Sequence, residues 1–243
     1  MSRQKTSAPA RLRWMHDRLA AYYGPQHWWP AETAFETIVG AYLTQNTAWK
    51  AVERSLENLQ AAGALTVDGL RALPMEELRR AIRPSGFYTR KAPALKAFVA
   101  MLDAEFAGQL EAMAAEPTPA LRKRLLGLPG VGPETADAVL LYALGHAVPV
   151  ADEYLRRIAE RHGLIAIAES KAAPARGKAG GRGSIGYDAM AELTRQAFAT
   201  EPATDWARLF NEFHALTVAV GKAHCGRTAR CEGCPLESDL RRG

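Results

Sequence analysis

The chain has 243 residues and a mass of 26.4 kDa, which is enough to bury a stable hydrophobic core without the support of disulfide bonds or a bound metal. Hydrophobic residues make up 48% and charged residues 23%, so the composition excludes wholesale disorder and a coiled-coil rod. The formal net charge of +5 suits a polyanionic partner, but an ordinary basic protein has it too. No apolar run approaches the roughly 20 residues of a membrane span, and the first 20 residues lack the apolar region of a secretory signal. We therefore expect a cytoplasmic protein that does not engage membranes.

Helical periodicity predicts an all-α protein. Apolar residues recur at spacings of three and four, and no segment shows the clean alternation of a strand. The expected helices cover residues 10–23, 32–44, 48–60, 76–83, 93–106, 120–128, 134–145 and 152–162. Glycine and proline mark their ends, as at Gly24, Pro74 and Gly163.

Two segments lack this periodicity. Residues 1–10 are expected to form a disordered tail, and residues 169–185, rich in Ala, Gly, Lys and Arg, a flexible loop. The basic residues of this loop fit either contact with a phosphate backbone or a solvated linker.

The most informative segment is the helical hairpin expected at residues 125–145. Gly130, Val131 and Gly132 form its turn, and Pro133 opens the next helix, where its missing N–H is not needed. Glycines let the backbone approach a ligand closely, and the N–H groups of the turn and helix start attract an anion. Glycines serve a plain turn between two helices equally well.

The segment LPGVGPETA with the apolar helix after it resembles the helix-hairpin-helix DNA glycosylases of the endonuclease III superfamily. The resemblance extends over about residues 12–236. It implies that the turn grips the DNA backbone without reading a base. The residues expected to do so are Gly130, Val131, Gly132 and Thr135.

The resemblance also implies two helical lobes that flank a DNA-binding cleft. A six-helix barrel with the hairpin is expected at residues 33–145, and the other lobe at residues 11–32 and 146–243. Double-stranded DNA containing damaged bases is the implied partner, and we expect a monomer.

Asp152 matches the family's catalytic aspartate, in the segment VPVADEYLRRIAERHGL. Breaking an N-glycosidic bond gives the sugar oxocarbenium character, which a carboxylate stabilises while orienting or deprotonating the attacking water. Aspartate also suits the start of the helix that follows, and one residue can do both.

Glu134 stands where members with lyase activity carry a lysine, two residues after the second hairpin glycine. That lysine forms a Schiff base with the sugar, which a carboxylate cannot do. The resemblance therefore implies a monofunctional glycosylase. Glu134 also complements the dipole of the helix it opens.

Matching positions imply that Gln45, in LTQNT, fills the gap left by an extruded base, and that Phe87, in SGFYTRKA, wedges beside the orphaned base. Gln45 acting only at a helix end, and Phe87 acting only in the core, are the structural alternatives.

Trp28, Trp29 and Trp49 are the candidates for a base pocket. Indole rings attract a cationic methylated purine by about 0.5–2 kcal/mol, although most tryptophans anchor a core. The combination of WWP, LTQNT, RPSGFY and the hairpin resembles the 3-methyladenine glycosylase branch more than the pyrimidine-damage branch.

The three cysteines, Cys225, Cys231 and Cys234, lie in a C-terminal loop expected at residues 225–243. This loop resembles the family's 4Fe-4S loop, but Leu240 replaces the fourth ligand. Three alternatives stay open: a cluster with one corner filled by water or His224, a zinc ion held by the thiolates and His224, and a loop without metal. None is needed for the chemistry.

These observations predict a monofunctional DNA glycosylase of base excision repair that hydrolyses the N-glycosidic bond of damaged bases, in particular alkylated purines. The alternatives are an endonuclease III-like glycosylase for oxidised pyrimidines or mismatches, and a non-catalytic helix-hairpin-helix DNA-binding protein.

Overall fold

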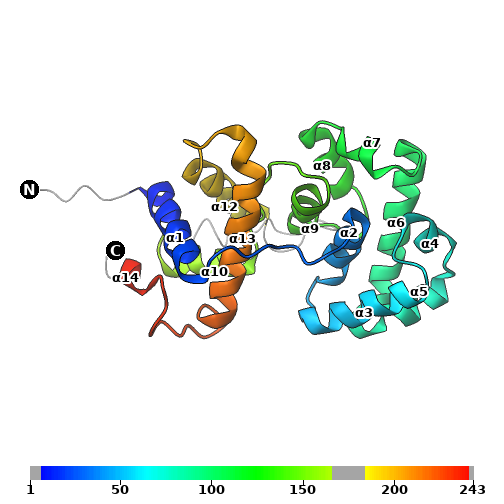
Figure 1. Cartoon of the computed structure of the whole chain (residues 1–243), viewed down its shortest axis with the longest axis horizontal. Coiled ribbons are helices and arrows are strands. Elements are labelled where there is room, and N and C mark those ends of the chain that lie inside the picture. The colour runs from blue at the N-terminus through cyan, green and yellow to red at the C-terminus, as the bar shows by residue number, and fades with distance from the viewer. Residues whose placement is uncertain (1–6, 166–183, 241–243) are drawn as a thin grey trace, which may run out of the picture. The chain divides into compact units, whose positions relative to one another are not determined.

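The computed structural model describes residues 7–165 and 184–240. Over these residues the chain is helical and has no strand apart from one isolated bridge between Cys225 and Ala229, which confirms the all-α prediction. The chain divides into two compact units, residues 1–28 with 147–243 (unit 1) and residues 29–146 (unit 2), drawn in Figure 1. The expected division lay at 32/33 and 145/146. None of the helices in the described part is long and apolar enough to cross a membrane.

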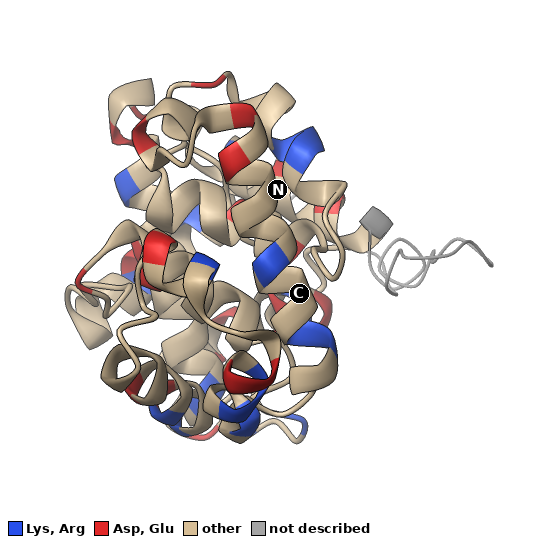
Figure 2. Cartoon of the chain, turned by 90° about the vertical axis from the view of Figure 1, so that its right-hand side faces the viewer, with Lys and Arg blue, Asp and Glu red and all other residues tan. Residues whose placement is uncertain are grey.

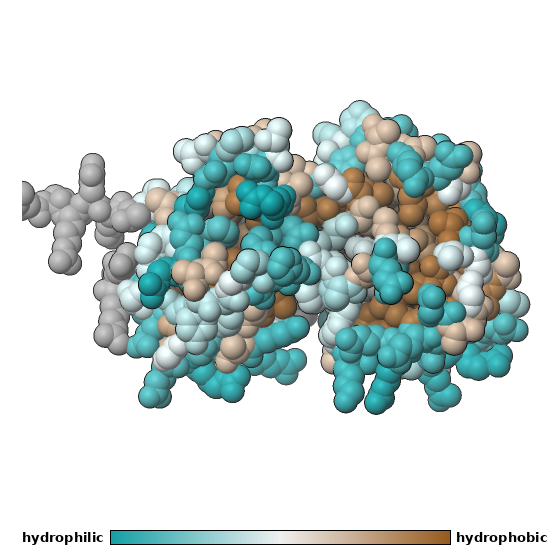
Figure 3. Space-filling model, viewed as in Figure 1, coloured by the Kyte–Doolittle hydropathy of each residue, from teal (hydrophilic) through white to brown (hydrophobic). Residues whose placement is uncertain are grey.

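Unit 2 is built around α6, Tyr88–Phe106, whose buried Leu95, Phe98 and Leu102 pack against the shorter helices. The other elements of unit 2 are α2 (Ala34–Leu43), α3 (Trp49–Ala61), α4 (Val67–Ala72), α5 (Met75–Ala81), the 3-10 turn η1 (Arg83–Ser85), α7 (Leu110–Ala114), α8 (Thr118–Leu126), α9 (Pro133–Ala138) and the π-helical turn η2 (Val139–Ala143). On the face seen in Figure 3, apolar residues gather over α2 and α6, and hydrophilic residues line the edge along α3 and α5.

Two boundaries in unit 2 differ from the expected ones. Helix α6 begins five residues before Pro93 and continues through it. A proline inside a helix removes one hydrogen bond and crowds the carbonyl four residues earlier, and the packing of the buried face of α6 compensates for this cost. The second hairpin helix widens into the π-turn η2 after Ala138, where one uniform α-helix was expected.

Unit 1 has its core between α1 (Ala8–Tyr23), α12 (Ser184–Ala197) and α13 (Trp206–Ala223). Its other elements are α10 (Glu153–Arg161), the 3-10 turn η3 (Ala203–Asp205) and α14 (Glu237–Leu240). Phe198, Phe210 and Phe213 form a buried aromatic cluster, with centroids of Phe198 5.7–6.0 Å from those of the other two.

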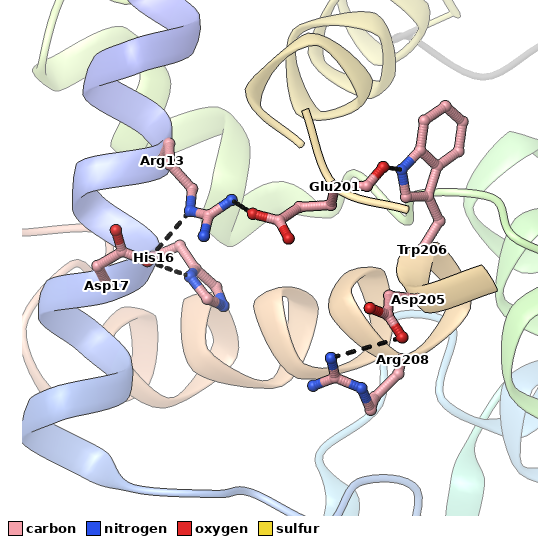
Figure 4. Close-up of polar contacts among 7 residues, drawn as sticks. All are labelled: Arg13, His16, Asp17, Glu201, Asp205, Trp206 and Arg208. Carbon is pink, nitrogen blue, oxygen red and sulfur yellow. Dashed lines mark hydrogen bonds and ion pairs between the residues drawn. The ribbon is translucent and has the colours of Figure 1, made fainter. Parts of the chain in front are cut away.

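Polar contacts tie α1 to the segment between α12 and α13 (Figure 4). Arg13 forms an ion pair with Glu201, and the His16 ring lies 2.9 Å from a carboxylate oxygen of Asp17. Trp206, at the start of α13, donates from Nε1 to the carbonyl of Glu201 over 3.1 Å. Glu201, in the segment after α12, is thus held to α1 through its side chain and to α13 through its carbonyl.

The expected tail of residues 1–10 is too long. Ser7 caps α1, which begins at Ala8, so residues 8–10 are helical, while residues 1–6 lie outside the described part. The cap forms because the Ser7 hydroxyl accepts from the N–H of Ala10 and Pro9 suits a first turn. The loop expected at 169–185 falls outside the described residues except for 184–185, which start α12.

Charges of both signs are interleaved along the helices of both units, as Figure 2 shows. Many are paired over one helical turn, as Arg156 is with Glu153 and Glu160. The described residues therefore present a mixed surface and not one basic face.

Candidate active site and DNA-binding hairpin

The hairpin of unit 2 joins α8 to α9 through a turn that needs one of its two glycines for conformation. Gly130 has a φ of +76°, in the left-handed region that favours glycine. Gly132 has a φ of −99°, and a Cβ placed on it would meet nothing within 4 Å. The fold itself therefore does not require glycine at 132. Its bare backbone suits a ligand that approaches from outside the chain.

The hairpin is also the binding partner of Gln45. The Gln45 side chain donates from Nε2 to the carbonyl of Gly130 over 3.0 Å and to the Thr135 hydroxyl over 2.9 Å. Thr135 is only 7% exposed, so its side chain faces the protein. Val131 is likewise buried. At these two positions only main-chain atoms are open to a ligand from outside the chain.

Phe87 is placed as a wedge residue would be. Its ring is 58% exposed, and its backbone, at a φ of 47°, is in the left-handed region just before α6. Such a conformation is costly for a side chain larger than asparagine, and it persists only where the surroundings impose it. Phe87 is therefore not a core residue, which removes the structural alternative for it.

Trp29 and Trp49 are brought together in unit 2. The rings of Trp29 and Trp49 lie 5.4 Å apart at 81°, and Tyr142 lies 5.3 Å from Trp29. A Cβ on Gly40 would come within 3.2 Å of the Trp29 ring, so this glycine makes room for the indole. Trp28 belongs to unit 1, where Lys222 lies over its ring at 5.8 Å.

Asp152 in unit 1 is the cap of α10. Its Oδ1 accepts from the N–H of Leu155 over 2.8 Å, which satisfies one first-turn donor of the helix. Its Oδ2 lies 3.6 Å from Nε2 of His214 on α13, and both side chains are 9% exposed. The helix start favours a negative charge here. The carboxylate thus keeps one oxygen outside the cap.

Close packing of α10 on α13 brings Asp152 and His214 together. A Cβ on Gly221 of α13 would come within 2.1 Å of the Tyr154 ring, two residues after Asp152. Only glycine admits that ring, so the two helices approach closely enough for His214 to reach Asp152. Glu134, at the position of the family's lyase lysine, lies on the exposed first turn of α9 in unit 2.

The three cysteines line one cavity of about 260 Å³ in unit 1, together with His224 and Leu240. Burial raises the pKa of the Cys234 thiol, and the nearby Cys225 and Cys231 raise it further. In the described part of the chain, no three His, Cys, Asp or Glu side chains converge closely enough to hold a single metal ion.

All three thiols line the cavity, whereas Leu240 offers no ligand at the position of the family's fourth cysteine. Arg161 anchors the cysteine loop. Its guanidinium donates to Sγ of Cys225 over 3.0 Å and to the carbonyls of Gly226 and Arg227 over 2.8 Å.

Several residues of these sites carry no signal that identifies them in the sequence. His214 is a lone histidine in an apolar helix, and Gly221 is one glycine among 20. Tyr142 falls in a stretch that reads as an ordinary apolar helix. Their roles arise from contacts between distant segments, which one sequence does not specify.

Comparison with known proteins assigns the chain to a family. Residues 39–176 match the model of the HhH-GPD superfamily base excision DNA repair proteins. The chain belongs to this family, and it is a DNA glycosylase of base excision repair. The resemblance to the endonuclease III superfamily, inferred from the hairpin, is confirmed.

Individual proteins are similar over most of the chain. A provisionally named DNA repair glycosylase of Methanocaldococcus jannaschii is 38% identical over 90% of this chain and 90% of its own length. Endonuclease III of Bacillus subtilis is 27% identical over 86% of this chain and 81% of its own. The solved structure of the H. pylori 3-methyladenine DNA glycosylase bound to 1,N6-ethenoadenine has a TM-score of 0.70 at 27% identity, over 90% of this chain and 98% of that one.

Proposed function

We propose that the protein is a monofunctional glycosylase that hydrolyses the N-glycosidic bond of alkylated purines in duplex DNA. The observation that carries the chemistry is the arrangement at Asp152. One carboxylate oxygen is fixed by the start of α10, and the other is next to His214 and outside the cap. A fixed carboxylate of this kind stabilises a developing positive charge on a sugar.

The reaction needs only this chain's residues and water. As the bond between C1′ and the base nitrogen breaks, its electron pair leaves with the base, and a cationic methylated purine departs neutral without being protonated. Oδ2 of Asp152 stabilises the cationic sugar and takes a proton from the water that adds to C1′. His214 positions this oxygen.

The aromatic group of Trp29, Trp49 and Tyr142 supports the choice of substrate. Stacked rings hold a cationic purine through its faces, with little demand for hydrogen bonds. The similarity to a 3-methyladenine DNA glycosylase bound to an ethenoadenine points the same way. Trp28 remains the third candidate for the pocket from the sequence.

Glu134 supports hydrolysis without strand cleavage. A carboxylate cannot form the imine that precedes lyase chemistry. We therefore expect the protein to leave an abasic site, and borohydride not to trap it on DNA. Covalent trapping would contradict this part of the proposal.

The DNA partner is held at the hairpin and by the Gln45 and Phe87 segments. We propose that the chain acts as a monomer in the compartment that holds the DNA, which in a bacterium is the cytoplasm. The cysteine cavity would hold a 4Fe-4S cluster by Cys225, Cys231 and Cys234, where it would stiffen the C-terminal loop. The chemistry at the sugar does not pass through it.

The direct test is release of free base from methylated, ethenoadenine-containing, oxidised and deaminated duplexes, identified by mass spectrometry. We expect alkylated purines from the wild type and a loss of at least about 100-fold in Asp152→Asn. Asparagine keeps the helix cap, so this variant should melt as the wild type does. Unchanged release in the variant would defeat the assignment of Asp152. Release of oxidised pyrimidines or mismatched bases alone would favour the endonuclease III-like alternative, and tight duplex binding without any release would favour the non-catalytic one.

A further inference from the structure

Lys91 is a buried cation that the proposed chemistry does not use. It lies one turn into α6, four residues after Phe87, and is only 4% exposed. Burial lowers its pKa to about 8. A buried ammonium is costly unless its donors are matched, and such a cost is usually explained by a specific contact.

All three donors of Lys91 have an acceptor. Its Nζ donates to the carbonyl of Leu43 over 2.7 Å, to the Thr47 hydroxyl over 2.8 Å and to the carbonyl of Ser85 over 2.9 Å. An ammonium has three hydrogens, so the match is complete.

These acceptors come from two separate segments. Leu43 and Thr47 bracket Gln45, in the loop between α2 and α3. Ser85 ends η1, two residues before Phe87. The Thr47 hydroxyl adds a direct link, since it lies 2.6 Å from the carbonyl of Ser85 and 3.0 Å from that of Gln45.

Ser85 is itself held in place by two further hydrogen bonds. The N–H of Ser85 donates to the Ser55 hydroxyl on α3 over 3.1 Å, and the Ser85 hydroxyl donates to the carbonyl of Ile82 over 2.7 Å. Both serines are buried. The turn before Phe87 therefore has little freedom once Lys91 is in place, which accounts for the imposed left-handed backbone of Phe87.

We propose that Lys91 is a positioning residue that couples the Gln45 loop to the Phe87 turn, so that the two side chains enter the duplex in a fixed relation to each other. This inference rests on the proposed function, because it concerns a duplex from which a nucleotide is extruded. It adds a residue that touches neither DNA nor the reacting atoms.

Lys96 on the same helix is a matched control. Its Nζ also has three acceptors, here the carbonyls of Leu70, Arg71 and Leu73, over 2.6–2.9 Å. These all lie at the end of α4 and just after it, away from the Gln45 and Phe87 segments. Removing Lys96 tests the loss of a lysine bound to carbonyls without loss of the coupling.

The test uses a duplex with a tetrahydrofuran abasic analogue opposite 2-aminopurine, whose fluorescence reports how the orphaned base is stacked. The full-length wild type, Lys91→Met, Lys96→Met and Phe87→Ala are each compared at saturating protein. Anisotropy gives the duplex affinity and circular dichroism gives the melting temperature. Lys91→Gln, which keeps a polar group in the site, is measured beside Lys91→Met to guard against misfolding.

We expect the Lys91 variants to bind the duplex but to give the fluorescence of Phe87→Ala, while Lys96→Met gives that of the wild type. Base release at single turnover should fall about 10- to 100-fold in the Lys91 variants, the effect of a misplacement of about 1 Å. Wild-type fluorescence from a folded Lys91 variant, or an equal loss in Lys96→Met, would overturn the proposal.

The fluorescence readout is separate from glycosylase activity. The abasic analogue has no base to release, so the orphan signal does not depend on the chemistry. If the wild type released no base from any lesion but the variants kept the expected fluorescence pattern, the proposed function would fail and the coupling by Lys91 would stand.

Discussion

Asp152 uses one carboxylate oxygen to cap its own helix, which leaves the other for chemistry. Its capping role follows from its place before an amphipathic segment, and the sequence predicts it. The approach of His214 to 3.6 Å does not follow from any local pattern, because α10 and α13 are about 60 residues apart in the chain. The catalytic role of the pair is a proposal that one substitution can test.

His214→Gln should slow base release at single turnover by about tenfold or more, with duplex affinity and melting temperature close to those of the wild type, since partners that orient a reactive group typically contribute this much. A double-mutant cycle checks the route of the effect. If His214 acts through Asp152, then Asp152→Asn with His214→Gln should be no slower than Asp152→Asn alone. Additive losses would assign His214 a separate role.

At the scale of elements, the hairpin separates two uses of glycine. Gly130 serves the turn, and Gly132 leaves open space that the chain itself does not fill. The turn and the helix after it are predictable from the sequence, because the GVGP segment sets them through local backbone chemistry.

Gly132→Ala should change the free energy of unfolding by less than about 1 kcal/mol, since the loss at the helix cap is offset by a less flexible unfolded chain. Duplex affinity should fall about tenfold or more, as expected when a charge-assisted hydrogen bond to phosphate is obstructed. Gly130→Ala is the contrasting variant, and its left-handed backbone should cost stability as well. Unaltered affinity in Gly132→Ala would show that DNA does not approach this position.

Other elements show where sequence reasoning reaches its limit. Lys91 follows SGFYTR in a helix with many polar residues, so it reads as an exposed lysine, and only the fold encloses it. The sequence offers Trp29 and Trp49 among three candidates for the pocket, and Tyr142 joins them through a contact with Trp29 across 113 residues. Contacts of this range depend on the arrangement of whole helices.

At the scale of the whole molecule, both ends of the described chain are joined within unit 1. Asp239 of α14 receives hydrogen bonds from Arg11 of α1 and from His162, just after α10. Burial alone would raise the pKa of Asp239, but the bonds from Arg11 and His162 lower it overall. Burial lowers the pKa of His162, in spite of Asp239. This network holds the C-terminal segment next to Leu240, where the family has its fourth cysteine.

The network predicts a loss of stability in acid. Both groups have depressed pKa values in the folded state, so the unfolded chain binds more protons and folding becomes less favourable as pH falls. The loss should begin near 6.5 through His162 and deepen below about 3.8 through Asp239, the ordinary values from which each is lowered. Urea unfolding at a series of pH values measures this loss of stability.

Asp239→Asn should lower the free energy of unfolding by about 1–3 kcal/mol at pH 7 and show a shallower decline in stability below pH 4. An unchanged pH profile in this variant would contradict the role of the network.

If Gln45 fills the gap as proposed, its two amide bonds to the hairpin would affect how the protein travels along DNA. With Gln45 as the gap-filling side chain, insertion exchanges two existing bonds for new ones, so probing an intact duplex yields no net gain and the side chain returns to its resting partners. An orphaned base offers replacements for both. The protein would then stay longer on the duplex only where a base has been extruded. It could therefore scan intact DNA rapidly and still pause at damage.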